Sequence, residues 1–103
     1  MANDGEEISY EALREAMSDN AVALIDVREP HEYAAGSPPG AVNRPLSSFN
    51  PAELPRDKPV VLICRSGGRS MNALNRSRQA GFADARHFRG GVIGWSQSGG
   101  ELV

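Results

Sequence analysis

Residues 60–70 read VVLICRSGGRS, and this stretch decides the fold class. Val60–Ile63 is a continuous apolar run of strand length that follows Pro59. Continuous apolar strands are typical of parallel sheets, whose two faces are both covered by helices. After the two glycines, the residue pattern predicts a helix over Ser70–Ala80 that ends at Gly81. The stretch therefore predicts a buried strand, a glycine-rich loop and a helix in succession.

The rest of the chain alternates between strands and helices in the same way. Ser9 is expected to cap a helix over Tyr10–Met17, and Ala21–Val27 is a second apolar run of strand length. Alternation of this kind predicts an α/β fold with an open sheet of four or five strands. The remaining expected elements are a short helix at Glu29–Ala35, an edge strand at Ala41–Asn43, an irregular crossover with at most one short helix at Pro45–Pro59, a strand at Ala85–Phe88 and a helical turn at Val92–Gln97.

Length and cysteine content limit the kinds of protein this chain can be. Its 103 residues suit one domain, with a core at about residues 8–98 and flexible ends at about 1–6 and 98–103. Cys64 is the single cysteine, which excludes an internal disulfide and a multi-cysteine zinc site and is typical of a reducing compartment. The longest apolar runs have five residues, whereas a membrane helix needs roughly 20. We expect a cytoplasmic protein with no signal peptide, membrane contact, metal or cofactor.

The formal net charge of −2 conceals a strong segregation of charge along the chain. Residues 1–63 carry 11 acidic and 5 basic side chains, whereas residues 64–89 carry six arginines and only Asp84 as an acid. The positive segment begins at Cys64, and it is expected to attract an anionic ligand. A sequence pI near 5.6 and few aromatic residues argue against nucleic acid as the partner.

The chemistry is concentrated in the loop Cys64–Ser70, which lies between the predicted strand and helix. Ligands of open α/β sheets bind outside the carboxyl ends of the strands. Gly67 and Gly68 allow successive N–H groups to converge on an anion, and the helix that follows adds the positive end of its dipole. Arg65 and Arg69 add two positive charges. A lone cysteine is usually a small buried apolar residue, but this combination favours a nucleophilic thiolate with a depressed pKa at Cys64.

Four segments of the chain together resemble the rhodanese domain family. Cys64–Ser70 matches its active loop, and the similarity spans about Ile8 to Ser98 in the family order. The other three segments are LIDVREPHEY at Leu24–Tyr33, GAVN at Gly40–Asn43 followed by Pro45-Leu46, and Gly81-Phe82 followed by GGVIGW at Gly90–Trp95.

This resemblance implies a three-layer sandwich with a parallel sheet of about five strands, and a sulfurtransferase activity. By analogy, Cys64 takes the sulfane sulfur of thiosulfate or of a persulfide donor and passes it to cyanide or to a thiol, for example that of a thioredoxin-like protein. Arg65 and Arg69 would hold the sulfonate end of the donor. Ser66 and Ser70 would donate hydrogen bonds, although Ser70 serves equally well as the helix N-cap. A monomer and a dimer both fit this description.

Two other functions compete with sulfur transfer. The chain is alternatively a non-enzymatic sulfur carrier or protein-binding module that uses its arginine face. A third interpretation is phosphatase or arsenate reductase chemistry, whose Cys-x5-Arg loop is one residue longer than the spacing from Cys64 to Arg69. Ile63 also stands where phosphatases of this type place a histidine. The shorter loop favours sulfur transfer.

Several polar residues outside the loop have an ordinary structural interpretation. Asp26 and Arg28 are more consistent with a strand-end pair, or with capping of the helix at Glu29, than with a brace for the loop. His31 and His87 are both expected at the surface, because each lies among polar or charged neighbours.

The chain departs from the family pattern at two places. Gly36–Gly40 reads GSPPG where the family usually has Gly-His-Ile-Pro-Gly. Arg76 and Ser77 replace a leucine pair, so that Met71, Leu74 and Ala80 would have to supply the apolar stripe of their helix. We therefore expect a shifted loop at the first place and a loosely packed helix at the second.

Overall fold

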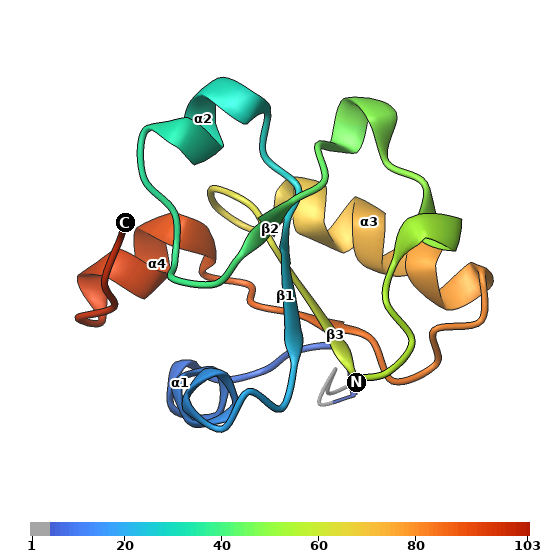
Figure 1. Cartoon of the computed structure of the whole chain (residues 1–103), viewed down its shortest axis with the longest axis horizontal. Helices are drawn as coiled ribbons and strands as arrows, with labels where there is room; N and C mark the ends of the chain where they lie inside the picture. Colours follow the sequence, from blue (N-terminus) through green and yellow to red (C-terminus); the bar gives the residue numbers. More distant parts are fainter. Residues whose placement is uncertain (1–4) are drawn as a thin grey trace.

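Four parallel strands form the sheet, in the order β2–β1–β3–β4 (Figure 1). The computed structural model describes residues 5–103. In the two central strands, Asp26 pairs with Ile63 at the last position, so both strands end at the same edge of the sheet. Cys64 follows directly at that edge. The strands are β1 (Ala23–Asp26), β2 (Val42–Asn43), β3 (Val60–Ile63) and β4 (Arg86–His87).

The position of a fifth strand, which the family resemblance implies, is occupied by a single parallel bridge between Glu7 and His87. The backbone N–H of His87 donates to the carbonyl of Glu6 (2.8 Å), and the N–H of Ile8 donates to that of His87 (3.2 Å). Because β4 has only two residues, its hydrogen-bond ladder with the segment around Glu7 cannot extend beyond this bridge. In the described residues the sheet has four strands, with this segment along its β4 edge.

Helices cover both faces of the sheet. Figure 1 shows α1 and α4 on one side and α3 on the other. The crossover before β3 contains two short 3-10 turns, Leu46–Ser48 and Pro51–Glu53, where at most one short helix was expected. The second turn forms because Pro51 suits a first helical position and the Asn50 side chain accepts a hydrogen bond from Ala52 N–H. The helices are α1 (Tyr10–Ser18), α2 (Pro30–Ala34), α3 (Gly68–Gln79) and α4 (Gly91–Gln97).

Alternate residues of the central strands pack into two separate cores. Ile25 and Leu62 point into the core on the α3 side, where they meet Leu74. Leu24 and Ile63 point into the opposite core. All of these side chains are almost completely buried, and each contributes roughly 1.5–3 kcal/mol by leaving water. The prediction of strands covered on both faces is confirmed.

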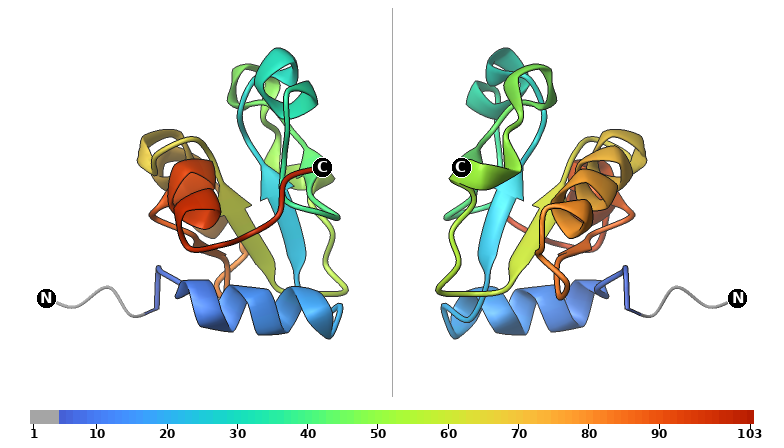
Figure 2. Two further views of the ribbon diagram at one scale, coloured as in Figure 1. Left: turned by 90° about the vertical axis from the view of Figure 1, so that its left-hand side faces the viewer. Right: turned by 90° about the vertical axis from the view of Figure 1, so that its right-hand side faces the viewer.

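Helix α1 begins and packs as predicted. The Ser9 hydroxyl accepts a hydrogen bond from Ala12 N–H (3.1 Å), and Leu13 is completely buried. Figure 2 shows α1 at the end of the sheet where the strands begin, and α2 at the opposite end. The carboxyl edge with Cys64 therefore lies on the side of α2, far from α1.

Arg76 and Ser77 of α3, which replace the leucine pair of the family, are accommodated by hydrogen bonds to nearby carbonyl groups. Ser77 is fully buried, and its hydroxyl donates to the carbonyl of Ala73 (2.7 Å). Arg76 donates to the carbonyl of Phe49 (2.8 Å) and lies over its ring. Ala73 is buried in the core, whereas Ala80, expected in the apolar stripe, is exposed.

The C-terminal tail, expected to be a flexible end, is hydrogen-bonded to the rest of the domain. Val103 N–H donates to the carbonyl of Ser37 (2.8 Å), and Ser37 N–H donates back to Val103 (3.2 Å). The Trp95 indole donates to the carbonyl of Glu101 (2.7 Å). At the other end, residues 1–4 of the expected flexible segment lie outside the described residues.

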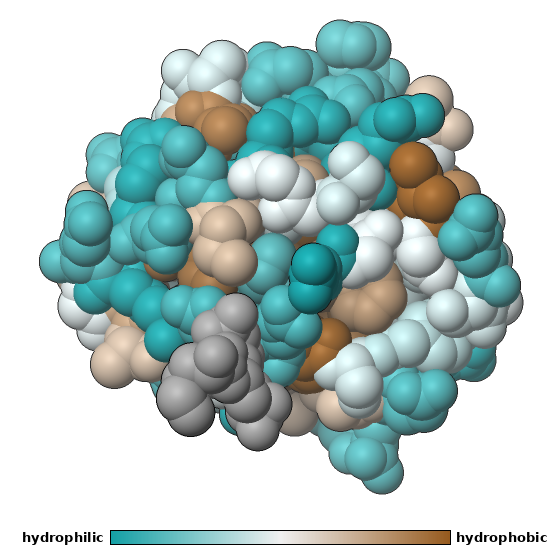
Figure 3. Space-filling view, turned by 180° about the vertical axis from the view of Figure 1, so that it is seen from behind, coloured by the Kyte–Doolittle hydropathy of each residue, from teal (hydrophilic) through white to brown (hydrophobic). Residues whose placement is uncertain are grey.

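The molecular surface is mixed in character. Figure 3 shows hydrophobic patches separated by hydrophilic side chains on the face seen from behind. Over residues 5–103, every helix is too short or too polar to cross a membrane.

Candidate active site

The Cys64 side chain lies at the centre of a loop whose N–H groups point at its sulfur. The N–H of Gly67 donates to Sγ at 3.1 Å, and the N–H of Ser70 donates to Sγ at 3.2 Å. The Ser70 hydroxyl oxygen lies 3.5 Å from the same sulfur. Cys64 is only 1% exposed, so these partners replace water around the sulfur.

This surrounding favours the thiolate. Burial by itself raises the pKa of the Cys64 thiol. Hydrogen bonds from the Ser70 hydroxyl and from the N–H groups of Ser70, Gly67 and Ser66 outweigh that effect, and the pKa of Cys64 is lowered. The start of α3 directs the positive end of its dipole at the same sulfur. The loop can therefore hold a negative charge at Cys64.

Gly67 is the glycine that the loop requires. It caps α3 with φ of +106°, in the left-handed region that disfavours other residues. A Cβ at this position would overlap the carbonyl oxygen of Arg89. Gly91, the first residue of α4, is required for the same reason, since a Cβ added there would overlap the backbone of Arg65. Gly68 has open space around it and a φ that other residues adopt, so only one of the two predicted glycines needs to be glycine.

Ser70 lies inside the first turn of α3, and the N-cap is Gly67, so the alternative that Ser70 caps the helix is wrong. Its side chain is fully buried and points into the site. The hydroxyl oxygen is 3.1 Å from the Gly67 carbonyl and 2.8 Å from His87 Nδ1. Ser70 thus connects the Cys64 sulfur to β4.

Arg69 is paired with an acidic residue of α2. Its guanidinium donates to both carboxylate oxygens of Glu32, at 2.7 and 3.0 Å. Hydrogen bonding to Arg69 lowers the pKa of Glu32 to about 2. Glu32 was not predicted as a site residue, although it belongs to the segment that resembles the family's N-terminal signature.

Arg65 and Ser66 lie on the outside of the loop. Both are exposed, and Arg65 lines an open groove of about 480 Å³. Val92, Ile93 and Leu102 form an apolar wall of the same groove. Of the two predicted arginines, Arg65 is therefore the one that faces solvent, and Arg69 shares its charge with Glu32.

The expectation of a surface position is wrong for His87, which is 1% exposed. Strand residues alternate between faces, and in β4 the exposed residue is Arg86. This alternation was the available signal, but a two-residue strand is too short for it to stand out. His31 is exposed, as predicted.

Asp26 and Arg28 form a buried ion pair behind the site. Arg28 donates to Asp26 Oδ2 through Nη2 at 2.8 Å, and the same nitrogen donates to the carbonyl of Gly36 (2.8 Å). The pair thus ties the end of β1 to the loop after α2. Its hydrogen bonds do not reach residues 64–70 directly.

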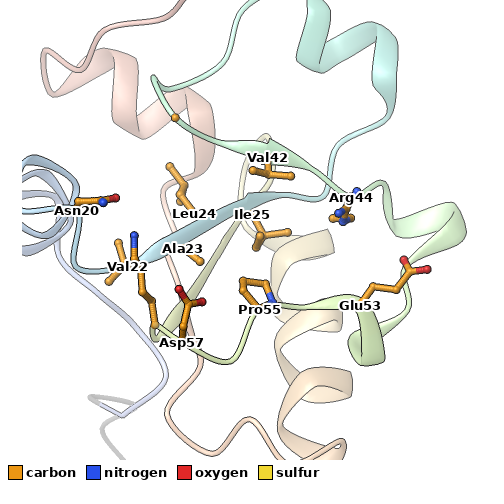
Figure 4. Close-up of a pocket in the computed structure, with 12 residues that line it drawn as sticks. Asn20, Val22, Ala23, Leu24, Ile25, Val42, Arg44, Glu53, Pro55 and Asp57 are labelled. Atoms are coloured by element: carbon orange, nitrogen blue, oxygen red, sulfur yellow. The ribbon is translucent and has the colours of Figure 1, made fainter.

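A second groove contains none of the residues of the loop Cys64–Ser70. This groove has a volume of about 400 Å³ and lies along β1 and β2. Figure 4 shows its lining, which includes apolar residues such as Val22 and Val42 and charged residues such as Arg44 and Glu53. A cavity of about 330 Å³ lies beside the loop itself, where Gly67, Gly68 and His87 contribute to its wall. The hydrogen bonds around Cys64, rather than cavity size, identify the candidate site.

An open parallel α/β sheet with a buried, thiolate-favouring cysteine between a central strand and a helix defines the class of this protein. A family model described as "Rhodanese-like domain" matches residues 9–98, and the chain belongs to this family. A crystal structure of a rhodanese-related protein from Thermoplasma volcanium has a TM-score of 0.86 and 32% identity, covering 95% of this chain and 97% of that one.

Relatives of similar length carry sulfurtransferase names. The chain is 38% identical to a sulfurtransferase of Allochromatium vinosum, covering 94% of each protein. It is 31% identical to the human thiosulfate:glutathione sulfurtransferase, covering 85% of this chain and 90% of the relative. Against an uncharacterised Synechocystis protein, 40% identical, the chain spans 52% of the relative's length.

Proposed function

We propose that this protein is a sulfurtransferase whose reactive group is the Cys64 thiolate. The thiolate attacks the sulfane sulfur of thiosulfate, the S–S bond breaks, and sulfite leaves with the bonding electron pair. With a persulfide donor, a thiolate leaves in the same way. Cys64 then carries a persulfide, and an acceptor thiolate or cyanide takes its outer sulfur and regenerates the Cys64 thiolate.

The observation that carries this proposal is the set of N–H groups directed at Cys64 Sγ. Gly67 and Ser70 donate to the sulfur at 3.1 and 3.2 Å. A loop that stabilises an anion at this point stabilises the attacking thiolate before transfer and, in the return step, the same thiolate as the leaving group. The two relatives that this chain matches over most of their length are named sulfurtransferases, which supports the same chemistry.

The structure offers less support for the other two functions. The convergent N–H groups already surround a single sulfur atom, whereas a phosphate ester needs room for three liganded oxygens above the cysteine. A binding module is favoured by one observation, the apolar groove beside Arg65, which would suit the surface around a partner's thiol. We propose that this groove receives the acceptor, so that binding serves the transfer.

A mass measurement tests the proposal directly. Incubation with thiosulfate should add about 32 Da, the mass of one sulfur atom, to the intact protein, and dithiothreitol should remove it. Cys64→Ser should show neither the adduct nor thiocyanate formation from cyanide. Full cyanide-dependent activity in Cys64→Ser would rule out the proposal. Partner binding without turnover would favour the carrier module, and Cys64-dependent hydrolysis of an aryl phosphate would favour the phosphatase.

We predict that Arg65 helps to bind the anionic donor. Arg65→Ala should raise KM for thiosulfate about threefold to tenfold, the range expected for loss of one exposed charge near an anion. Arg86→Ala is the matched control, because Arg86 is also exposed but lines a separate cavity with Ile8 and Val22. Equal KM values for the two variants would show that only the overall charge matters.

A further inference from the structure

A chain of three buried side chains connects the reactive sulfur to β4. Ser70 Oγ lies 3.5 Å from Cys64 Sγ on one side and 2.8 Å from His87 Nδ1 on the other. Ser70 is 0% exposed, and Cys64 and His87 are each 1% exposed. No step of the transfer described above uses His87, yet it is in hydrogen-bond contact with a partner of the nucleophile.

The number of protons available to these three side chains restricts which ring nitrogen of His87 is protonated. The Ser70 hydroxyl has one proton, and its oxygen also lies 3.1 Å from the carbonyl oxygen of Gly67, which already accepts from Met71 N–H. A carbonyl and a thiolate are acceptors only. If His87 Nδ1 were unprotonated as well, three acceptors would compete for one proton, and the sulfur would be the most distant of them. A proton on Nδ1 makes the ring a donor, which leaves the sulfur and the Gly67 carbonyl as the two acceptors for the hydroxyl proton. That carbonyl already accepts from Met71 N–H, so the sulfur is the acceptor with the greater need.

We infer that His87 is a neutral histidine protonated at Nδ1, and that it acts as a positioning residue by donating to Ser70 Oγ and thereby directing the Ser70 hydroxyl proton at the Cys64 thiolate. The inference rests on the proposed function, because it assumes an ionised Cys64. Hydrogen bonds in such a chain polarise one another, so the bond from His87 strengthens the bond from Ser70 to the sulfur. No proton is transferred; the two donors only orient and polarise.

The second ring nitrogen supports the same tautomer. Within residues 5–103, His87 Nε2 is buried and has no hydrogen-bond partner. Protonated at Nδ1, the ring leaves only an acceptor unpaired. Protonated at Nε2, it would leave a buried N–H unpaired and would also take the Ser70 proton away from the sulfur.

The charges around the chain are compatible with a neutral ring. Burial lowers the pKa of His87, Glu7 and Glu6 act against this effect, and Arg89 adds to it. The net result is a lowered pKa, which keeps the imidazole uncharged near neutral pH. At the Cys64 end of these three hydrogen-bonded side chains, the positive charge of Arg69 interacts favourably with the thiolate.

Nitrogen NMR on the unmodified protein tests the tautomer without any variant. The chain has two histidines, so long-range proton–nitrogen spectra of labelled protein contain only two imidazole patterns. Near pH 7.5 the His87 ring should show the neutral Nδ1–H pattern. A neutral Nε2–H pattern or an imidazolium pattern would overturn the inference.

Alkylation of Cys64 tests the effect on the thiolate. We expect His87→Leu to raise the midpoint of the pH profile for iodoacetamide alkylation by about one pH unit, so that reaction below the midpoint slows about tenfold. His87→Asn should keep the midpoint close to the original, since its amide N–H can replace Nδ1–H. Ser70→Ala should raise the midpoint too, and adding His87→Leu to it should have no further effect.

Controls separate this role from a structural one. His31→Leu, at an exposed histidine, should leave the midpoint unchanged. A folded His87→Leu variant with an unchanged midpoint would overturn the inference, and if that variant does not fold, the NMR pattern decides. Neither measurement uses a sulfur donor, so the result stays readable whether or not the 32 Da adduct forms.

Discussion

Glu32 orients the guanidinium of Arg69 in the loop Cys64–Ser70. The two-point ion pair of 2.7 and 3.0 Å joins α2 to the first turn of α3. Arg69 is therefore oriented by the fold, and we propose that it assists an anionic donor while remaining bound to Glu32. Among residues 5–103 no ion pair holds the exposed Arg65, and for that reason we propose that Arg65 contributes more than Arg69 to donor binding.

The Glu32 pair makes stability depend on pH in a defined direction. Because the pKa of Glu32 is lowered from 4.5 to about 2, the ionised carboxylate stabilises the folded state above about pH 4.5, and this stabilisation is lost as pH falls towards about 2. Glu32→Gln should lower the free energy of unfolding at pH 7 by about 1 kcal/mol, since solvent screens the partly exposed pair. Urea denaturation from pH 7 to about pH 3 should show this difference shrinking.

The matched control for this measurement is Glu15→Gln, at an exposed glutamate of α1. It should change the free energy of unfolding by much less at every pH. A Glu32→Gln difference of equal size at pH 7 and pH 3 would show that the ion pair is not its cause.

At the scale of elements, the start of α3 depends on how closely the loop approaches the segment before α4. Gly67→Ala should lower the free energy of unfolding by about 2–4 kcal/mol, because the methyl group meets the Arg89 carbonyl and the backbone must keep a positive φ. Urea denaturation measures the change. The loop should also lose its N–H geometry, so the alkylation rate of Cys64 should fall.

Gly68→Ala provides the adjacent control. A Cβ at this position meets nothing within 4 Å, and Gly68 is the first residue of the helix. We expect a change of less than about 1 kcal/mol in the free energy of unfolding, in the stabilising direction. A cost at Gly68 equal to that at Gly67 would contradict the assignment of Gly67 as the required glycine.

At the scale of the whole molecule, the buried pair of Asp26 and Arg28 joins β1 to the loop that receives the C-terminal tail. Arg28 binds the carbonyl of Gly36, and the next residue, Ser37, is hydrogen-bonded to Val103. Arg28→Met should lower the free energy of unfolding by about 3–5 kcal/mol, because it leaves the Asp26 carboxylate buried without its partner. Urea denaturation of Arg28→Met, of Asp26→Asn and of the variant that combines them measures these free energies.

Asp26→Asn combined with Arg28→Met should cost less than the sum of the two single changes, since no charge is then left unpaired. Additive costs would show that the two side chains act independently, and that the pair is not what joins β1 to the loop.

The elements of the fold were predictable because each carries its own local signal. Val60–Ile63 matches β3 in the structure, and the helix expected over Ser70–Ala80 corresponds to α3, which begins two residues earlier. The earlier start follows from the contact of Gly67 with the Arg89 backbone, which lies beyond the range of a local pattern. The four strands of the described residues agree with the four or five predicted from the alternation of elements. The fifth strand that the family resemblance implies is replaced by a single bridge next to β4.

The sequence by itself determined the α/β class, the doubly covered central strands and the placement of Cys64 at the carboxyl edge of the sheet, because apolar periodicity, glycines and caps act over a few neighbouring residues. Only the tertiary structure decided that Glu32 holds Arg69 and that His87 is buried against Ser70. These contacts join residues 17 to 37 positions apart. Their formation depends on how the sheet and helices pack together, and a local sequence pattern carries no information about contacts between residues so far apart along the chain.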